Sequence, residues 1–537
     1  MCKEFFCGKC FQMIKNPVYA VMVIIGLAAI FASVKVNGQH TKRYGFRAEI
    51  IRGPYLQVAT AHSMMIRWRT DEPELSRVRF GVQLGHLNHL AADTGRKKEH
   101  SITITGLLPF TRYYYLIEGA KDTLQGGEKN SFTTLPAVGK EGKYRIGVFG
   151  DCGNNSVNQR NTRDQFEKYI GDSVLNAWIL LGDNAYSFGK DIEYQSNFFN
   201  IYKDNLLKRA PLFPAPGNHD YHDEPYMARV AAESGEVAYY QNFSMPVNGE
   251  SGGVPSHTPA FYSYDIGNIH FLSLDSHGQE DNNSRLFDTL GRQVQWIKKD
   301  LEANQNKGWI IAYWHHPPYT MGSHNSDQEK QLIKIRENFI RILERYGVDL
   351  VLCGHSHSYE RSKLMAGYYG MEEAFNTGKY VLSNSSGVYD STANSCPYVK
   401  DSTNRGTVYV VSGSSGALDY SQKTFPHNAM CYSDVSIGGS CILEIEANRL
   451  DLKWICADGV IRDRFTIMKG VNKHAVIESK KGQTIRLTAS YVGSYNWTNF
   501  PASARTVAVT PATGTTTFIV SDSLGCIKDT FIVNVTR

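Results

Sequence analysis

Five short motifs in the middle of the chain constrain its fold more strongly than any other feature. Each follows an apolar run of strand-like length and supplies carboxylate, amide or imidazole side chains beside small or turn-forming residues. Gly-Asp and Gly-His pairs are common in turns, so one motif would mean little, but turn chemistry alone hardly explains five in series. They are Gly150-Asp151-Cys152-Gly153, Gly182-Asp183-Asn184-Ala185-Tyr186, Gly217-Asn218-His219-Asp220, Tyr313-Trp314-His315-His316-Pro317 and Gly354-His355-Ser356-His357.

The order of these motifs predicts an α/β domain over residues 144–468. Strand-like apolar runs occupy 144–149, 177–181, 308–314 and 348–352, and each ends at or just before a motif. Between the last two runs, residues 328–345 carry apolar side chains at helical spacing. Alternating strands and helices indicate an αβ-sandwich of layered sheets and helices. Ligands in open α/β sheets gather where strand ends meet loops, so we expect the motif side chains to converge there.

All-β regions flank this domain in the sequence. Residues 47–136 contain short alternating runs, such as 63–69 and 101–104, which predict a fibronectin III-like or immunoglobulin-like β-sandwich. Residues 472–537 are rich in Thr, Ser, Val and Gly, and a turn at 522–526 separates strand-like runs at 516–520 and 530–535. We predict a small immunoglobulin-like β domain there. The 537 residues are too many for one core, which agrees with a multidomain chain.

The N-terminus predicts export. Lysines at positions 3, 9 and 15 precede an apolar run over 17–34, which is followed by Val36-Asn37-Gly38-Gln39. This is the layout of a signal peptide over residues 1–38, but the run is also close to the length of an uncleaved membrane anchor. Both alternatives export the remainder as a secreted, periplasmic or cell-surface protein. No later apolar run approaches the length of a membrane span.

Seven cysteines remain after the leader, and an odd number in an exported protein leaves at least one thiol free. Cys152 and Cys353 lie inside the motifs, where we expect small buried residues rather than ligands. We predict disulfides between Cys396 and Cys431 and between Cys441 and Cys456, although sequence alone does not fix the pairing.

The side chains of the motifs favour a pair of metal ions. A phosphate ester resists hydrolysis because its anionic oxygens repel the nucleophile. Two adjacent cations neutralise that charge, orient the ester and lower the pKa of a bound water. Such a pair needs a bridging carboxylate together with imidazole and oxygen donors, which the five motifs supply. The net charge of +5 is too small to indicate nucleic acid as a stable partner.

The ordered motifs resemble those of the metallophosphoesterase (calcineurin-like) superfamily over most of residues 144–420. Tyr186, three residues after Asp183, narrows the resemblance to the purple acid phosphatase family, in which a tyrosinate bound to Fe(III) produces the colour. The segments 52–57 (RGPYLQ) and 354–361 (GHSHSYER) are similar to the same family. A β domain followed by a catalytic domain is also the arrangement of that family.

The resemblance implies two metal sites that share the Asp183 carboxylate. A phenolate favours a hard trivalent ion, so Fe(III) is implied at the first site, whereas imidazoles and an amide oxygen suit Zn(II), Fe(II) or Mn(II) at the second. The remaining implied ligands are Asp151, Tyr186 and His357 for the first ion and Asn218, His315 and His355 for the second.

The resemblance also implies two histidines that act on the substrate. His219 would face the phosphate and stabilise the charge that grows on it. His324, nine residues after His315, matches the leaving-group histidine of plant-type members, although the loop 319–327 lacks their second neighbouring histidine. We expect His316 to lie beside the ligands. Asp220 is a candidate for orienting His219, and residues 222–224 are expected to be loop surface.

The sequence therefore predicts an exported binuclear acid phosphatase that hydrolyses small-molecule phosphate monoesters by in-line attack of a metal-bound hydroxide. A phosphodiesterase or nucleotidase on the same metal core is an alternative, because the loops at 222–262 and 362–404 carry no readable substrate code. A surface-binding protein with a decayed catalytic core is another, but no expected ligand is missing. The sequence indicates no oligomeric state, and the only membrane partner would be reached through an uncleaved N-terminus.

Overall fold

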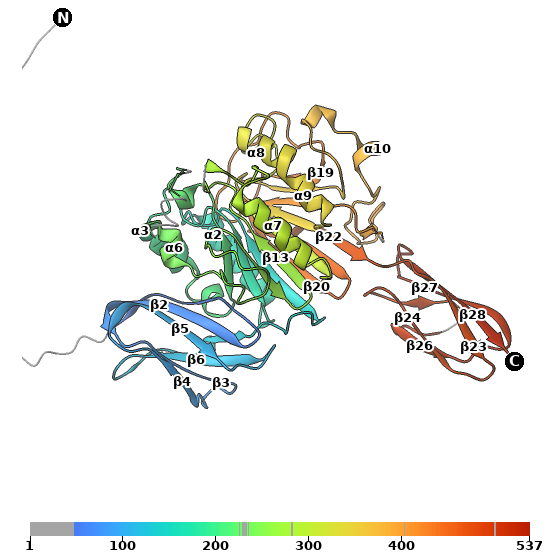
Figure 1. Cartoon of the computed structure of the whole chain (residues 1–537), viewed down its shortest axis with the longest axis horizontal. Coiled ribbons are helices and arrows are strands. Elements are labelled where there is room, and N and C mark those ends of the chain that lie inside the picture. Colours follow the sequence, from blue (N-terminus) through green and yellow to red (C-terminus); the bar gives the residue numbers. More distant parts are fainter. Residues whose placement is uncertain are drawn as a thin grey trace, which may run out of the picture. The chain divides into compact units, whose positions relative to one another are not determined.

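The computed structural model describes residues 48–537, except 225, 228–233, 235, 281–282, 402 and 499–500. The predicted signal peptide or anchor at 1–38 lies outside the described residues. Among the helices of the described part, none is long and apolar enough to cross a membrane. Figure 1 shows the central sheets and helices together with the smaller β-sheets formed by the first and last parts of the described sequence.

Two seven-stranded sheets form the centre of the fold. In sheet order, the first contains β11 (Leu212–Ala215), β10 (Ala177–Leu181), β9 (Lys143–Phe149), β20 (Gly439–Glu446), β21 (Arg449–Cys456), β22 (Ile461–Lys469) and β17 (Tyr398–Lys400). The second contains β12 (Tyr262–Ile266), β13 (Ile269–Ser273), β14 (Trp309–Trp314), β15 (Leu350–Cys353), β18 (Val408–Ser412), β16 (Tyr359–Ser362) and β19 (Met430–Asp434). The four predicted strand runs are therefore confirmed as β9, β10, β14 and β15.

Parallel pairing brings the motifs to common sheet edges. The strands β9, β10 and β11 are parallel, and so are β13, β14, β15 and β18. The carboxyl ends of parallel strands lie at the same edge of a sheet. Three motifs therefore emerge together from the first sheet, after β9, β10 and β11, and two from the second, after β14 and β15.

Alternate residues of β14 pack into two different cores. Ile311 and Tyr313 belong to a core shared with the first sheet, whereas Ile310, Ala312 and Trp314 lie in a second core. Helix α7 (Arg292–Ala303) and the continuous helical segment α8 (Lys330–Lys334), η5 (Ile335–Phe339) and α9 (Ile340–Arg345) contribute to that second core (Figure 1). The helix expected over 328–345 is confirmed. The two sheets thus pack against each other, and helices cover the other face of the second sheet.

Helix α2 (Val157–Ile170) follows the first motif and packs against β20 and β21. It begins where the Ser156 side chain accepts the Gln159 N–H, and it ends at Gly171. Phe166 and Ile170 on its buried face join the first core. The remaining helical segments are short: α3 (Asp191–Glu193), η1 (Tyr194–Phe199), α4 (Asn200–Tyr202), η2 (Leu206–Lys208), η3 (His219–Tyr221), α6 (Ala238–Asn242), η6 (Glu372–Ala374) and α10 (Thr377–Tyr380).

The first part of the described chain forms two β-sheets. One contains β1 (Ile50–Gln57), β2 (Ser63–Glu74) and β5 (Lys97–Thr105). The other contains β4 (His89–Ala92), β3 (Arg77–Gly81), β6 (Arg112–Glu118), β7 (Thr123–Gln125) and β8 (Ser131–Thr133). The alternation expected over 63–69 is confirmed, because Met64, Ile66 and Trp68 are buried while the residues between them are partly exposed.

Arg52 joins this β domain to the segment after the second motif. Its side chain is completely buried, and it donates to Gln195 Oε1 at 2.7 Å and to Asp191 Oδ1 at 2.8 Å. The guanidinium also lies 4.5 Å from the centre of the Phe199 ring. The RGPYLQ segment therefore anchors β1 to α3, which begins five residues after Tyr186, and to η1, which follows α3 directly.

The last part of the chain contains a four-stranded and a two-stranded sheet. The strands are β23 (His474–Lys480), β28 (Lys528–Thr536), β27 (Gly514–Ser521) and β25 (Asn496–Trp497) in the first, and β24 (Ile485–Thr488) and β26 (Thr506–Val509) in the second. Antiparallel pairing of β27 with β28 confirms the hairpin expected around the turn at 522–526.

Both predicted disulfides are wrong. The structure joins Cys396 to Cys526, and Cys431, Cys441 and Cys456 are free. Cys441 and Cys456 lie on the adjacent strands β20 and β21, but their register partners are Trp454 and Gly439, so the two cysteines are not opposite each other. The observed bond ties the C-terminal hairpin turn to a loop 130 residues earlier in the sequence. Cys152 and Cys353 are buried thiols, as expected.

A buried ionic cluster joins β12, β13 and α7 through Asp265, His270 and Asp300. The ring nitrogens of His270 are 2.8 Å from Asp265 Oδ1 and 2.6 Å from Asp300 Oδ2. Carboxylates accept hydrogen bonds, so both ring nitrogens carry protons and the ring is an imidazolium. Burial lowers the pKa of His270, but the hydrogen bonds and charges of the two carboxylates outweigh burial and raise it above the ordinary value.

We expect His270→Asn to lower the free energy of unfolding by about 3–5 kcal/mol near pH 5.5, because it leaves the buried Asp300 carboxylate without its cation, while Asp265 keeps its ion pair with Lys307. The folded-state pKa is raised, so this stabilisation is fully present below the unfolded pKa and is lost as pH rises through the folded value. Denaturant unfolding of the wild type and of His270→Asn across pH should show a difference in the free energy of unfolding that shrinks as pH rises. A difference independent of pH would contradict a charged His270.

Candidate metal centre

The ligand-bearing loops have an unusual backbone. Asp151, Asp183 and His355 have φ values of 55°, 51° and 68°, in the left-handed region that non-glycine residues seldom adopt. Such a conformation costs of order 1–3 kcal/mol and concentrates at functional sites. Three of the seven predicted ligands therefore lie at positions where the backbone is held against its local preference.

The glycines of the motifs allow the loops to approach the carboxylates closely. A Cβ atom at Gly217 would lie 2.2 Å from Asp183 Oδ1, and one at Gly354 would lie 2.5 Å from Asp151 Oδ2. Both distances are far below van der Waals contact. Any larger residue at these positions would displace a carboxylate, which explains why glycine precedes the Asn218 and His355 ligand positions.

Asp151, Tyr186 and His357 form the first group of donors. Tyr186 Oη lies 3.1 Å from Asp151 Oδ1 and 3.3 Å from His357 Nε2, and that nitrogen lies 3.7 Å from the same carboxylate oxygen. Adjacent donors around an ion with bonds of roughly 2.1 Å are separated by about 3.0–3.4 Å. Two of the three separations lie in that range and the third, 3.7 Å, is slightly longer, so small shifts of the side chains would bring the group around one ion.

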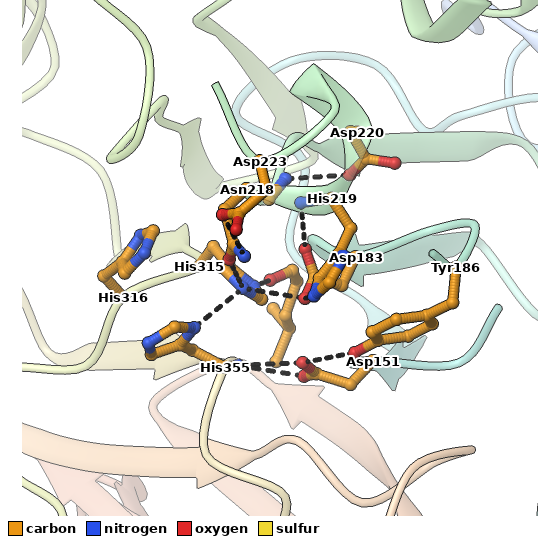
Figure 2. Close-up of polar contacts among 12 residues, drawn as sticks. Asp151, Asp183, Tyr186, Asn218, His219, Asp220, Asp223, His315, His316 and His355 are labelled. Atoms are coloured by element: carbon orange, nitrogen blue, oxygen red, sulfur yellow. Dashed lines mark hydrogen bonds and ion pairs between the residues drawn. The ribbon is translucent and has the colours of Figure 1, made fainter. Parts of the chain in front are cut away.

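His315, Asn218, His355 and Asp183 form the second group. Figure 2 shows three of these side chains directed at His315, whose Nε2 lies 3.0 Å from Asn218 Oδ1, 3.3 Å from Asp183 Oδ2 and 3.2 Å from His355 Nδ1. His315 Nδ1 lies 2.9 Å from the carbonyl oxygen of Leu181. A carbonyl only accepts, so Nδ1 carries the proton and the Nε2 lone pair is available to a metal.

Asp223 fixes the orientation of the Asn218 amide. The Asn218 Nδ2 donates to Asp223 Oδ1 at 3.1 Å, so the amide oxygen must be the atom that faces His315 (Figure 2). An amide oxygen and a carboxylate oxygen thus point at the same ring nitrogen, His315 Nε2. Buried oxygens in this arrangement need positive charge between them, either a proton on that nitrogen or a metal ion bound to it.

Asp183 links the two groups. Its carboxylate is almost fully buried and lies within 4.8 Å of donor atoms of both Asp151 and His315. Burial raises the pKa of Asp183, but His315 and the other nearby imidazoles outweigh burial and lower it well below its usual range. Burial likewise lowers the pKa of His315, but the Asp183 carboxylate raises it to about 9. The carboxylate is therefore charged, as a bridging ligand must be.

The pKa of Tyr186 is shifted in the opposite direction to that of Asp183 and favours the neutral phenol. Burial raises the pKa of the Tyr186 phenol well above its ordinary value, and the neighbouring Asp151 and Asp183 carboxylates raise it further. A phenolate at this position needs a compensating positive charge. A bound cation would supply that charge, so the phenol is suited to act as a ligand only when the site is occupied.

His219 lies beside the Asp183 carboxylate. Its main-chain N–H donates to Asp183 Oδ1 at 3.0 Å, and its Nδ1 lies 2.6 Å from the Ser187 carbonyl oxygen, which places a proton on Nδ1. The other ring nitrogen lies 3.8 Å from Asp183 Oδ2. In the described part of the chain, Asp220, the candidate for orienting His219, makes its hydrogen bonds to other groups and not to this ring. It accepts the Gly217 N–H at 2.8 Å and the Asn184 N–H at 3.1 Å and thereby ties two motif loops together.

The structure also brings His324 to the second group. The ring of His324 stacks on that of His355, with ring centres 3.7 Å apart, and its Nδ1 is hydrogen-bonded to Glu329. His316 lies on another side of His355, at 4.3 Å between ring centres. His316 Nδ1 is 2.8 Å from Ser276 Oγ. Donor atoms of His315, His316 and His355 lie within 4.8 Å of one another, so His316 lies within ligand distance of the second group.

Three residues near the site were not found from the sequence. Asp223, expected to be loop surface, instead orients Asn218. Glu329 binds two histidines of the site. His277 is buried and stacks near His316, and neither ring nitrogen has a hydrogen-bond partner in the described part of the chain. Asp223 and Glu329 each lie five residues after one of their partners, but no motif in the sequence marks that spacing as a contact.

Two family models match the chain. The N-terminal domain of purple acid phosphatases matches residues 51–134, and the calcineurin-like phosphoesterase model matches residues 144–359. Together the two matches cover more than half of the 537 residues and coincide with the β domain and with all the ligand-bearing loops. The chain belongs to the purple acid phosphatase family. The family suggested by Tyr186 and the RGPYLQ segment is thereby confirmed.

Individual members of the purple acid phosphatase family are distant from this chain. Purple acid phosphatase 15 of Arabidopsis thaliana is 29% identical over 295 residues, which are 50% of each protein. Acid phosphatase type 7 of Homo sapiens is 28% identical over 388 residues, covering 66% of this chain and 75% of the relative. The chain thus spans about half the length of this plant relative and 75% of the human one.

A solved member of the family shares the fold. The purple acid phosphatase PPD1 from yellow lupin seeds superposes with a TM-score of 0.57 at 18% identity, over 79% of this chain and 74% of that one. The structure of PhoD gives a TM-score of 0.54 at 13% identity. At these identities the similarity concerns the fold alone.

We expect Asp183→Asn to reduce bound metal from two ions per chain to one or none, because the amide removes the charge that both groups of donors share. Elemental analysis after dialysis against dilute metal measures this directly. Asp172→Asn, which changes an exposed carboxylate outside the site, is the matched control and should retain both ions. Full occupancy in the Asp183 variant would show that this carboxylate is not the bridge.

Proposed function

We propose that this member of the purple acid phosphatase family is a metal-dependent hydrolase of phosphate monoesters. The observation that carries the proposal is the convergence of ligand atoms around His315 Nε2, which lies 3.0 Å from Asn218 Oδ1 and 3.3 Å from Asp183 Oδ2. Family membership and the phosphoesterase match over 144–359 support the same activity. The chain spans only 50% of purple acid phosphatase 15 of Arabidopsis thaliana, so the activity of this chain is to be established by direct assay.

The donor sets support two ions of different character. The phenol of Tyr186 and the Asp151 carboxylate in the first group favour a hard trivalent ion such as Fe(III). The imidazoles of His315 and His355 with the Asn218 amide oxygen suit Zn(II), Fe(II) or Mn(II). When bound, such a pair would neutralise the phosphate, orient it and make a nucleophile available at working pH.

Two histidines of the chain would act on the ester itself. The Ser187 carbonyl holds a proton on His219 Nδ1, so an imidazolium at this position would present its Nε2–H on the side of Asp183, toward a bound phosphate. A donor there stabilises negative charge that grows in the transition state. His324 would supply the proton that an alkoxide leaving group needs, because its Nδ1 is occupied by Glu329 and its Nε2 remains available.

The Cys396–Cys526 disulfide supports export. Disulfides persist in secreted and periplasmic compartments and are rare in reducing ones. We propose that the chain is exported, and that its first and last β domains are fibronectin III-like and immunoglobulin-like modules on either side of the phosphatase domain in sequence. Substrates would then be small phosphate esters outside the cytosol.

An assay of p-nitrophenyl phosphate against bis(p-nitrophenyl) phosphate tests the proposed substrate class. We expect the monoester to be turned over faster, whereas preference for the diester would favour a phosphodiesterase on the same core. His219→Ala should lower kcat for the monoester by about 10²–10³-fold, the usual loss for one donor to a developing anion. The exposed His86→Ala is the control and should retain full activity.

The identity of the first ion has its own test. A tyrosinate bound to Fe(III) absorbs visible light, so protein loaded with iron should be coloured, and Tyr186→Phe should lose that absorption while the protein remains folded. Absorption spectra and iron content of both proteins are the measurements. Colour that survives the substitution would exclude Tyr186 as the chromophoric ligand.

A further inference from the structure

Glu329 lies between two histidines of the site that come from different loops. Its carboxylate oxygens are 2.9 and 3.1 Å from His324 Nδ1, and Oε2 is also 3.4 Å from His355 Nε2. A third residue, Asn325, donates its main-chain N–H to the carboxylate at 2.9 Å and holds it against the loop that carries His324. Glu329 is the residue directly before helix α8, so its backbone position is fixed by that helix.

These contacts determine which nitrogen of each ring faces the site. An ionised carboxylate only accepts hydrogen bonds, so the Glu329 contacts place protons on His324 Nδ1 and on His355 Nε2. His355 Nδ1 is then unprotonated, and this is the atom that lies 3.2 Å from His315 Nε2 in the second donor group. His324 Nε2 is left for a substrate, and the 3.7 Å stacking of the two rings keeps it beside the second group.

We propose that Glu329 is a positioning residue that orients His324 toward the leaving group and His355 toward the second ion. The proposal rests on the phosphatase activity proposed above. A carboxylate on the far nitrogen of a histidine fixes the tautomer and ring orientation, both for metal ligands and for histidines that transfer protons. In the reaction, the bond from phosphorus to the nucleophile's oxygen forms, the bond to the leaving oxygen breaks, and that oxygen takes the proton from His324 Nε2.

This role predicts an effect that depends on the leaving group. A nitrophenolate leaves without a proton, whereas an alkoxide requires one. The full chain, loaded with saturating metal, would be assayed with p-nitrophenyl phosphate and with the alkyl ester 2-glycerophosphate. We expect Glu329→Ala to lower kcat for the alkyl ester by about 10²-fold and for the aryl ester by less than about 3-fold. Glu329→Gln keeps one acceptor oxygen and should lose less.

The controls separate positioning from folding. Glu337→Gln alters a glutamate in the same helical segment that pairs with Lys334 at 3.0 Å, away from the site, and should leave both activities unchanged. His324→Ala should reproduce the leaving-group pattern, and the double variant should be no worse than His324→Ala alone, because both changes remove one function. Elemental analysis should find two ions per chain in every variant.

Equal losses on the two esters, additive losses in the double variant, or loss of one ion from Glu329→Ala at saturating metal would overturn the proposal. The donor atoms of His324, Glu329 and His355 lie within 4.8 Å of one another. If the wild-type protein bound a third ion and Glu329→Ala lost it, this group would be a metal site, which would equally overturn the proposal. Failure of the proposed function is distinguishable, because the wild-type protein would then hydrolyse neither ester.

Discussion

The buried Asp183 carboxylate lies among side chains that supply metal-ligating atoms. Asp151 lies on one side and His315 Nε2 on the other, while Asn218 directs its amide oxygen at the same nitrogen. This arrangement is unfavourable without positive charge, because buried acceptors that face each other gain no hydrogen bond. The left-handed backbone at Asp183 and the absence of a side chain at Gly217 both serve to hold the carboxylate there.

The rest of the fold restrains the loops that carry these groups. Parallel strands of two sheets deliver the five motifs to neighbouring edges, and Asp220 ties the second motif to the third. The β domain contributes from outside: buried Arg52 holds Asp191, and Glu193 in the same turn accepts the N–H groups of Ser187 and Phe188. The Ser187 carbonyl in turn binds His219. The RGPYLQ segment is thus connected by direct contacts to a proposed substrate-binding histidine.

The sequence carried most of the site because its ligands are encoded locally. A strand followed by glycine and a ligand is a short pattern, so Asp151, Asp183, Asn218 and His355 could be found because five such motifs follow one another in the sequence. The helix over 328–345 was equally visible in its apolar spacing. The family resemblance then assigned His324, whose place beside His355 is seen only in the structure.

What the sequence missed depends on tertiary contacts. Asp223 and Glu329 act on residues that the local pattern does not connect with them, and their neighbours in sequence resemble ordinary surface loops. The Cys396–Cys526 bond joins segments 130 residues apart, whereas the predicted Cys441–Cys456 pair fails because strand register sets the two residues off by two positions. Register and loop packing follow from the whole fold and are not readable from spacing alone.

Anomalous X-ray diffraction from crystals of the metal-loaded protein tests the central claim most directly. We predict two anomalous peaks about 3.5–4 Å apart, as in other two-metal sites, with one oxygen of the Asp183 carboxylate between them. Tyr186 and His357 should contact one peak and Asn218 and His315 the other. A single peak, or two peaks of which only one is bound by Asp183, would contradict the account.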